Sequence, residues 1–175
     1  RVTAGIGAPE FDAEGRVLVC DFGGLRVASL YLPSGSSGPQ RQAAKFRFMR
    51  AFRPWLARQA RARVPVLVCG DWNIAHTRKD LKNWRANQNY SGFLPEEREW
   101  LGGVLGELAW RDVWREQHPE AEGEGYTWWS QRGAARAKNV GWRIDYHVAT
   151  PALAARARRA WVEQRENFSD HAPLL

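Results

Sequence analysis

Short apolar runs separated by turn residues recur along the chain, and they constrain the fold more than any other feature of the sequence. Val17–Phe22 and Leu25–Leu32 are joined by Gly23-Gly24, a connection that predicts an antiparallel hairpin. The run Val64–Cys69 predicts a buried strand that ends where Gly70-Asp71 makes the chain turn. Further strands are expected at Tyr126–Trp129, Arg143–Val148, Ala160–Val162 and the opening of Ala172–Leu175.

Helical patterns stand between these strands. Apolar residues recur at helical spacing from Phe46 to Leu56, which predicts a helix up to Arg63. Pro95-Glu96-Glu97 starts another helix through about Leu105, with proline at the first position and acids in the first turn. Pro151–Arg156 is expected to be a short helix. Many short strands interleaved with a few helices, without repeats or linkers, indicate a layered α/β sandwich in one domain, residues 1–175.

Composition and charge narrow the class of protein. Hydrophobic residues make up 44% of the chain, as in a globular protein with a real core. The 26 Lys and Arg residues against 19 Asp and Glu give a net charge of +7, which favours a polyanionic partner such as nucleic acid, although a generically basic protein fits equally well. No apolar run is long enough to span a membrane and no signal peptide opens the chain, so we expect a cytoplasmic, monomeric enzyme.

Gly70-Asp71-Trp72-Asn73 places a carboxylate and an amide two residues apart, directly after a buried strand. An Asp can hold or deprotonate a water molecule, and an Asn can donate an N–H that fixes it, as attack on phosphorus requires. An Asx turn that only ends the strand explains the same four residues equally well.

Ser169-Asp170-His171 brings an acid and a histidine together at another predicted strand start. A histidine there can stabilise a phosphoryl oxyanion or act as acid or base, but the same residues also suit a surface turn. Asp145, inside an apolar strand, needs a partner if it is buried. That partner is either His171, as in catalytic triads, or the neighbouring Arg143 in a structural ion pair.

Taken together, these segments resemble the exonuclease III and abasic-site endonuclease family of the endonuclease/exonuclease/phosphatase superfamily. The resemblance extends over essentially the whole chain and rests on five motifs in family order: Ser29–Gly35, Gly70–His76, Gly92–Arg98, Asn139–Tyr146 and Ser169–Pro173. It implies a DNase I-like sandwich of two mixed sheets flanked by helices. It also implies a DNA-repair nuclease with 3′→5′ exonuclease, 3′-phosphatase and abasic-site endonuclease activities in unknown proportion, acting on double-stranded DNA with abasic sites or 3′ ends.

The resemblance assigns catalytic roles residue by residue. Asp71 is expected to align or activate the nucleophile and Asn73 to help position it. His171 is expected to contact the scissile phosphate while Asp145 orients it. Asp170, Asp71 and Asn73 are expected to be metal ligands, and the metal would be Mg²⁺, with Mn²⁺ as a substitute.

The remaining matches concern the substrate. Tyr31 corresponds to a tyrosine that reaches the phosphate or the leaving group, and Asn87 to an amide near the target phosphate. Trp128, Trp142 and Ile144 correspond to a small apolar pocket that receives an extrahelical abasic sugar, which costs little to extrude. A phosphate track is expected along Arg41, Arg47, Lys79, Lys82, Arg85, Arg132, Arg136 and Lys138.

The sequence departs from the family in two places. The family's N-terminal portion, with an Asn and the Glu that is the main Mg²⁺ ligand, is not matched here, so we expect an incomplete copy that binds metal poorly and is inactive by itself. Tyr90 stands where many members carry Asn, and a ring there would narrow the site and favour 3′-end trimming or 3′-phosphate removal over incision.

Two other interpretations stay open at this point. One is another phosphoesterase of the superfamily, acting on inositol phosphates or lipid headgroups. The other is a DNA-binding fragment without catalysis. Asn139–Tyr146 favours the nuclease, because this motif resembles the nuclease branch over its full length.

Overall fold

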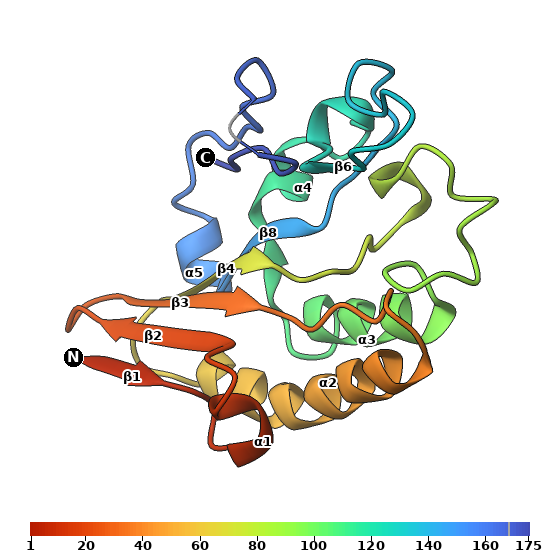
Figure 1. The fold of residues 1–175 in the computed structure, drawn as a ribbon. Helices are drawn as coiled ribbons and strands as arrows, with labels where there is room; N and C mark the ends of the chain where they lie inside the picture. Colours follow the sequence, from red (N-terminus) through yellow and green to blue (C-terminus); the bar gives the residue numbers. More distant parts are fainter. Residues whose placement is uncertain (168) are drawn as a thin grey trace.

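A computed structural model describes residues 1–167 and 169–175 of the chain. It contains a mixed six-stranded sheet, a small two-stranded sheet and flanking helices (Figure 1), which confirms the predicted α/β class. The large sheet has the order β1-β2-β3-β4-β8-β5. Its strands are β1 (Val2–Ala4), β2 (Val17–Asp21), β3 (Arg26–Tyr31), β4 (Val66–Asp71), β8 (Asp145–Ala149) and β5 (Arg111–Asp112).

The predicted hairpin and the predicted buried strand are both present. β2 and β3 pair antiparallel across the turn that contains Gly23, whose positive φ of 83° suits glycine. β4 lies between β3 and β8, and Val66 and Val68 are fully buried. β3 and β4 run parallel, whereas β8 is antiparallel to β4. The carboxyl ends of β3 and β4 and the start of β8 therefore meet at one edge of the sheet.

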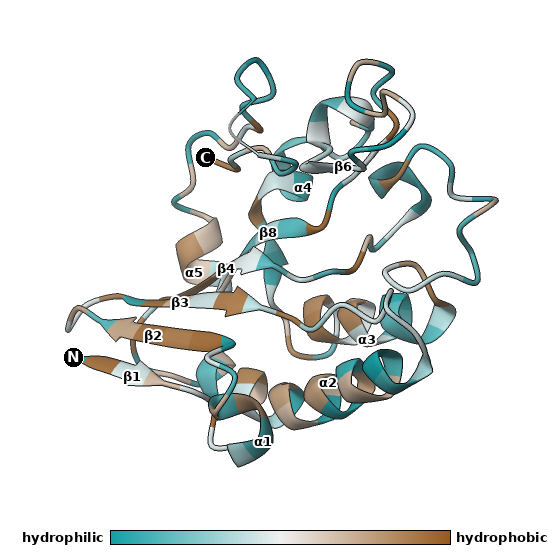
Figure 2. Ribbon diagram, viewed as in Figure 1, coloured by the Kyte–Doolittle hydropathy of each residue, from teal (hydrophilic) through white to brown (hydrophobic). Residues whose placement is uncertain are grey.

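Two helices cover one face of this sheet. The parallel strands β3 and β4 require a crossover connection, and the helix α2 (Pro39–Ala60) supplies it. α2 begins at Pro39 and ends at Ala60, so the expected extension to Arg63 is wrong by one turn. Phe48, Phe52 and Leu56 of α2 are buried in the main core, and Leu101 and Val104 of α3 (Pro95–Leu105) join them. In Figure 2, β2 and part of β3 are hydrophobic, whereas the visible part of β8 is hydrophilic.

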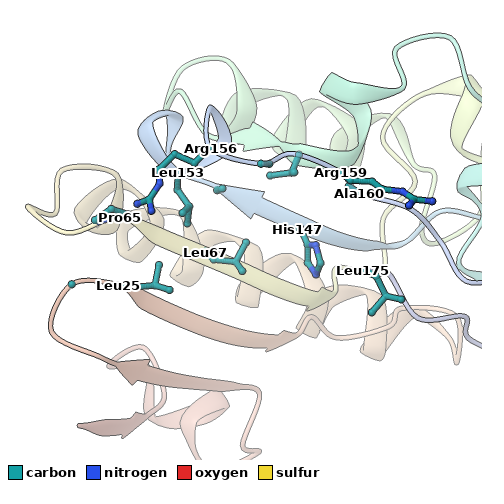
Figure 3. A pocket seen from close by; sticks show the side chains of 13 residues that line it. Leu25, Pro65, Leu67, His147, Leu153, Arg156, Arg159, Ala160 and Leu175 are labelled. Carbon is teal, nitrogen blue, oxygen red and sulfur yellow. The ribbon is translucent and has the colours of Figure 1, made fainter.

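The other face of the sheet carries smaller elements. These are α4 (Val113–Gln117), α5 (Pro151–Ala154) and the two-stranded sheet of β6 (Trp128–Trp129) and β7 (Gly141–Trp142). The short helix α1 (Pro9–Asp12) follows β1, and 3-10 turns lie at Arg78–Asp80 and Gly123–Gly125. An open groove of about 550 Å³ lies over this face between the sheet and α5, and Figure 3 shows Leu67, Leu153 and His147 pointing into it.

Four strand predictions need correction. The expected strand Arg143–Val148 begins only at Asp145, because the Arg143 N–H donates to the Asp80 carbonyl and the Ile144 N–H to the Thr127 hydroxyl instead of to a neighbouring strand. Tyr126–Trp129 likewise shortens to β6. Ala160–Val162 and Ala172–Leu175 form only an isolated bridge between Val162 and Leu174, with Trp161 and Leu175 exchanging two backbone hydrogen bonds.

In the part of the chain that the structure describes, no helix combines the length and the apolar composition that a membrane crossing requires.

Candidate active site

Three neighbouring strands bring predicted site residues to the same edge of the large sheet. Tyr31 ends β3 and is paired in register with Asp71, which ends β4. Asp71 is in turn paired with Asp145 at the start of β8. Residues that are 40 or more positions apart in the sequence are thus adjacent, because parallel β3 and β4 end at the edge where antiparallel β8 begins.

The segment after β4 is both an Asx turn and part of the site. Asp71 accepts the Asn73 backbone N–H through Oδ1 at 2.7 Å, and Asn73 adopts a positive φ of 51°. The Asn73 side-chain amide donates to the Leu32 carbonyl and to Asp71 Oδ2, both at 2.8 Å. The expectation that this N–H fixes a water molecule is therefore wrong in this arrangement, since both hydrogens are used, and the amide oxygen is the group left for the substrate side.

Asp145 pairs with His171 rather than with Arg143. His171 Nδ1 lies 2.8 Å from Asp145 Oδ2. Arg143 is instead buried between Asp80 and Asp112, at 2.7 Å from each. The geometry is that of an acid orienting a histidine, so of the two partners predicted for Asp145 the structure selects His171.

The pKa values of Asp71 and His171 are both raised in this site. Burial, followed by the neighbouring Asp145 carboxylate, raises the pKa of Asp71 to about 7. Burial by itself would lower the pKa of His171, but the hydrogen bond and charge of Asp145, assisted by Asp71 and Asp170, raise it above the ordinary value. Near neutral pH, Asp71 can therefore accept a proton, and His171 holds its proton more tightly than an ordinary histidine does.

One pocket of about 480 Å³ collects the predicted site residues. Asp145 lies behind His171, and all the others line the pocket: Tyr31, Asp71, Asn73, Asn87, Tyr90, Trp128, Trp142, Ile144, Asp170 and His171. Tyr31 and Tyr90 are 55% and 64% exposed, so both stand at its rim. The predicted site residues come from four of the five motifs and the segments between them, and Gly92 of the fifth motif also lines the pocket.

The apolar wall of the pocket is packed and anchored. Trp128, Trp142 and Ile144 belong to a cluster that also includes Phe93. The Trp128 indole N–H donates to Asp170 Oδ2 at 3.0 Å, which fixes the indole and gives the Asp170 carboxylate a definite direction. A flat apolar wall therefore stands beside an acid-rich wall.

The carboxylates alone do not make a complete metal site. A divalent cation such as Mg²⁺ needs oxygen ligands gathered around one point. Among residues 1–167 and 169–175, no group of three His, Cys, Asp or Glu side chains is placed to hold a metal ion. Asp71 and Asn73 bind each other, and Asp170 binds Trp128. The described residues thus offer single oxygen ligands, with Asp170 on the pocket wall, but do not by themselves fit a metal ion.

Two functional features escaped prediction from the sequence. Lys45 and Glu97 form a fully buried ion pair beneath the pocket, and Arg143 joins Asp80 and Asp112 in a buried network. The signal for Lys45 was present, because it lies three, four and seven residues before Phe48, Met49 and Phe52 on the apolar face of α2. A charge on such a face requires a buried partner.

A buried carboxylate beside an Asp–His pair, in a pocket at the edge of an α/β sandwich, is suited to acid–base catalysis by a hydrolase. Comparison with known proteins gives the family. The chain belongs to the endonuclease/exonuclease/phosphatase family, whose model matches residues 2–171. This confirms the superfamily that the five motifs indicated.

The similar proteins include an exodeoxyribonuclease, a DNA repair nuclease and a 3′ phosphatase. The chain is 37% identical over 174 residues to the exodeoxyribonuclease of Bacillus subtilis, covering 99% of this chain and 68% of that protein. It is 39% identical over 173 residues to the DNA repair nuclease APEX1 of Danio rerio, covering 99% of this chain and 55% of the relative. The solved structure of the 3′ phosphatase NExo from Neisseria bound to product DNA hairpin superposes with a TM-score of 0.90 at 27% identity, covering 99% of this chain and 68% of that one.

Proposed function

We propose that this chain forms the water-binding and phosphate-binding side of an active site that hydrolyses phosphate esters of DNA. The proposed activities are 3′→5′ exonuclease, 3′-phosphatase and abasic-site endonuclease. One observation carries the proposal: Asp71 and the His171–Asp145 pair share a pocket with the apolar wall of Trp128 and Trp142. The 3′ phosphatase and the repair nucleases to which the chain is similar support it.

Each polar group has a chemical task in this proposal. Asp71, with a pKa of about 7, accepts the proton of the attacking water. The Asn73 amide oxygen accepts the second hydrogen of that water and so fixes its direction. Protonated His171, held by Asp145, donates to a phosphoryl oxygen on which charge develops. Tyr31, at the rim of the pocket, would reach the phosphate or the leaving group.

A divalent ion completes the proposal. The family is generally dependent on divalent metals, and we propose Mg²⁺, with Mn²⁺ as a substitute. When bound, the ion neutralises charge on the phosphate. Asp170 is the ligand that this chain would supply, and further ligands would have to come from outside the described residues, since these hold no group of three candidate side chains.

The proposed substrate is double-stranded DNA with an abasic site or a blocked 3′ end. The wall of Trp128, Trp142 and Ile144 suits a sugar without a base. The net charge of +7 favours a polyanion. Of the basic residues proposed as a phosphate track, Arg47 pairs with Glu10 and Lys79 with Glu120 at the surface, so these two are partly neutralised before DNA binds.

The test compares DNA with a different phosphate ester. Binding and hydrolysis are measured for a 3′-phosphorylated hairpin, an abasic duplex and an inositol phosphate, each with Mg²⁺ or EDTA. Because the described carboxylates do not complete a metal site, the chain is assayed alone and as a completed fusion. In this fusion, the part of the Bacillus subtilis exodeoxyribonuclease outside the match is joined to it.

We expect both DNAs to bind in EDTA with an affinity that falls as salt rises. We expect the completed fusion to hydrolyse them only with Mg²⁺, and the chain alone to hydrolyse little. Preferred hydrolysis of the inositol phosphate, or hydrolysis that persists in EDTA, would contradict the proposal.

A further inference from the structure

We propose that Lys45 and Glu97 are positioning residues, whose buried ion pair fixes the backbone of Asn73 and Gly92 and thereby sets the shape of the pocket. The two side chains come from different helices, Lys45 from α2 and Glu97 from the first turn of α3. Neither touches the proposed substrate position. Their catalytic meaning rests on the proposed function, whereas their effect on the backbone does not.

The pair is unusual for a purely structural contact. Lys45 Nζ lies 2.7 Å from Glu97 Oε1, and both side chains are 0% exposed. Removing two charges from water is costly, and apolar side chains of similar volume often stabilise a core as well or better. A fully buried pair is thus weak evidence for a role in stability. The other contacts of Lys45 and Glu97 point to a different role.

Lys45 makes its second contact with the site itself. Its ammonium donates to the backbone carbonyl of Asn73 at 2.7 Å. Asn73 is in the left-handed region, with a φ of 51°, which is uncommon for a residue other than glycine. Its N–H is held by Asp71 on the other side. Lys45 therefore binds the carbonyl of Asn73, while Asp71 binds the backbone N–H of the same residue.

Glu97 holds the neighbouring wall. Its Oε2 accepts the Gly92 N–H at 2.6 Å and the Leu94 N–H at 3.2 Å. Gly92 has a φ of 95°, and a Cβ there would lie 3.2 Å from the Trp142 ring and 3.3 Å from the Asn73 carbonyl oxygen. Gly92 also accepts the Ala75 N–H at 2.7 Å. A shift of Gly92 would therefore move both the loop after Asn73 and the ring of Trp142.

Both side chains of the ion pair thus bind backbone groups that border the pocket, Lys45 at Asn73 and Glu97 at Gly92. A helix cap alone needs only Glu97, which already accepts from backbone N–H groups at the start of α3. The lysine adds the connection to Asn73. The pair thereby ties α2 and α3 to the two loops that carry the amide and the apolar wall of the pocket.

The test separates positioning from stability. The variants are Lys45→Met, Glu97→Gln and the double variant Lys45→Met/Glu97→Gln. The control is Arg53→Met/Glu107→Gln, which removes an ion pair of 2.7 Å between α2 and the segment after α3, away from the pocket. The single variant Lys45→Met leaves a buried charge and should lower the melting temperature most, and the double variant should recover much of that loss.

The decisive measurement is amide hydrogen exchange in the refolded double variant of the 175-residue chain. We expect the amides of Asn73 and Gly92 to exchange about tenfold faster than in the wild type, while Val68 in β4 and all amides of the control stay within about twofold. Wild-type exchange at Asn73 and Gly92 in the double variant, or an equal increase at Val68, would overturn the proposal. If the double variant does not fold, Glu97→Gln alone is judged by the same criterion.

Hydrolysis by the completed fusion gives the catalytic half of the test. The double variant should lose about 10–100-fold in kcat with KM changed less than about threefold, because misplacement of reacting groups lowers the rate more than binding. An unchanged kcat beside faster exchange would overturn the positioning role in catalysis. A wild-type fusion that hydrolyses no DNA would instead refute the proposed function, and hydrogen exchange would still decide the effect on the backbone.

Discussion

Two hollows of the molecule, one over the large sheet beside α5 and one at the end of β4, differ in their contents. The groove beside α5 measures about 550 Å³ and is lined by small or apolar residues apart from His147, Arg156 and Arg159. The pocket at the end of β4 measures about 480 Å³ and holds Asp71, Asp170 and His171. The larger hollow has no acidic side chain among the described residues that line it, so the arrangement of charged groups rather than the volume identifies the candidate active site.

The two histidines of these hollows make the same point. His147 lies two residues after Asp145 on β8, and burial lowers its pKa. His171 is also buried in part, but its pairing with Asp145 at 2.8 Å raises its pKa. A histidine is thus a neutral lining residue at position 147 and a candidate cation at position 171. The difference comes from the Asp145 carboxylate, which pairs with His171.

The largest expected effect is on the proposed general base. Asp71→Asn in the completed fusion should lower hydrolysis of the 3′-phosphorylated hairpin about 10²–10⁴-fold, because the water loses its proton acceptor. His147→Ala, in the groove, should change the rate less than about twofold. A larger loss from His147→Ala than from Asp71→Asn, measured as initial rates of phosphate release, would reverse the comparison.

The next effect concerns the orienting acid. Asp145→Asn should lower the pKa of His171, because burial then acts without the carboxylate, and should reduce hydrolysis about 10–100-fold, as loss of an orienting partner commonly does. NMR titration of the ring protons measures both histidines in one sample. We expect the pKa of His171 to fall below its wild-type value while the pKa of His147 stays unchanged. An unchanged pKa of His171 would contradict the role of Asp145 as its partner.

The fold and the site were predictable to different degrees. The hairpin of β2 and β3 and the start of α3 follow from Gly23-Gly24 and Pro95, because turn and cap chemistry is local. Asp71, Asn73 and His171 were found through their motifs, and all three line the pocket. The late start of the strand predicted at Arg143–Val148 was not predictable, since it depends on Asp80 and Thr127, which are far away in sequence.

The buried charges show the limit most clearly. Arg143 was considered as a partner for the nearby Asp145, yet it binds Asp80 and Asp112. Lys45 and Glu97 are 52 positions apart and meet only because α2 and α3 pack on the same face. Proximity in the sequence favours Asp145 as the partner of Arg143, which is wrong, and gives no indication that Lys45 pairs with Glu97. Both sets of partners are fixed by tertiary packing.

A smaller effect is expected on stability as a function of pH. The pKa of Asp71 is raised from 3.8 to about 7, so the folded state binds a proton that the unfolded state has released in this window. The free energy of unfolding should therefore fall as pH rises from about 4 to about 7, on the order of 4 kcal/mol for this group. Denaturant unfolding of Asp71→Asn should show a flatter pH dependence than the wild type, and parallel curves would argue against the raised pKa.

The smallest expected effect is at the rim. Tyr90→Asn should raise incision of abasic duplex relative to 3′-phosphate removal by a few-fold, because the exposed ring narrows the entrance beside Trp142. Tyr90→Phe, which keeps a ring at the same position, serves as the comparison. Equal activity ratios for wild type and Tyr90→Asn would remove Tyr90 from the specificity argument.

The most direct test of the account asks where a DNA phosphate binds. The 175-residue chain is titrated in EDTA with a 3′-phosphorylated DNA hairpin, and the NMR signals of the His171 and His147 rings and of the Trp128 and Trp142 indoles are followed. The account predicts that the signals of His171, Trp128 and Trp142 shift with DNA concentration while His147 stays unchanged. Shifts at His147 without shifts at His171 would place the phosphate in the groove and contradict the account.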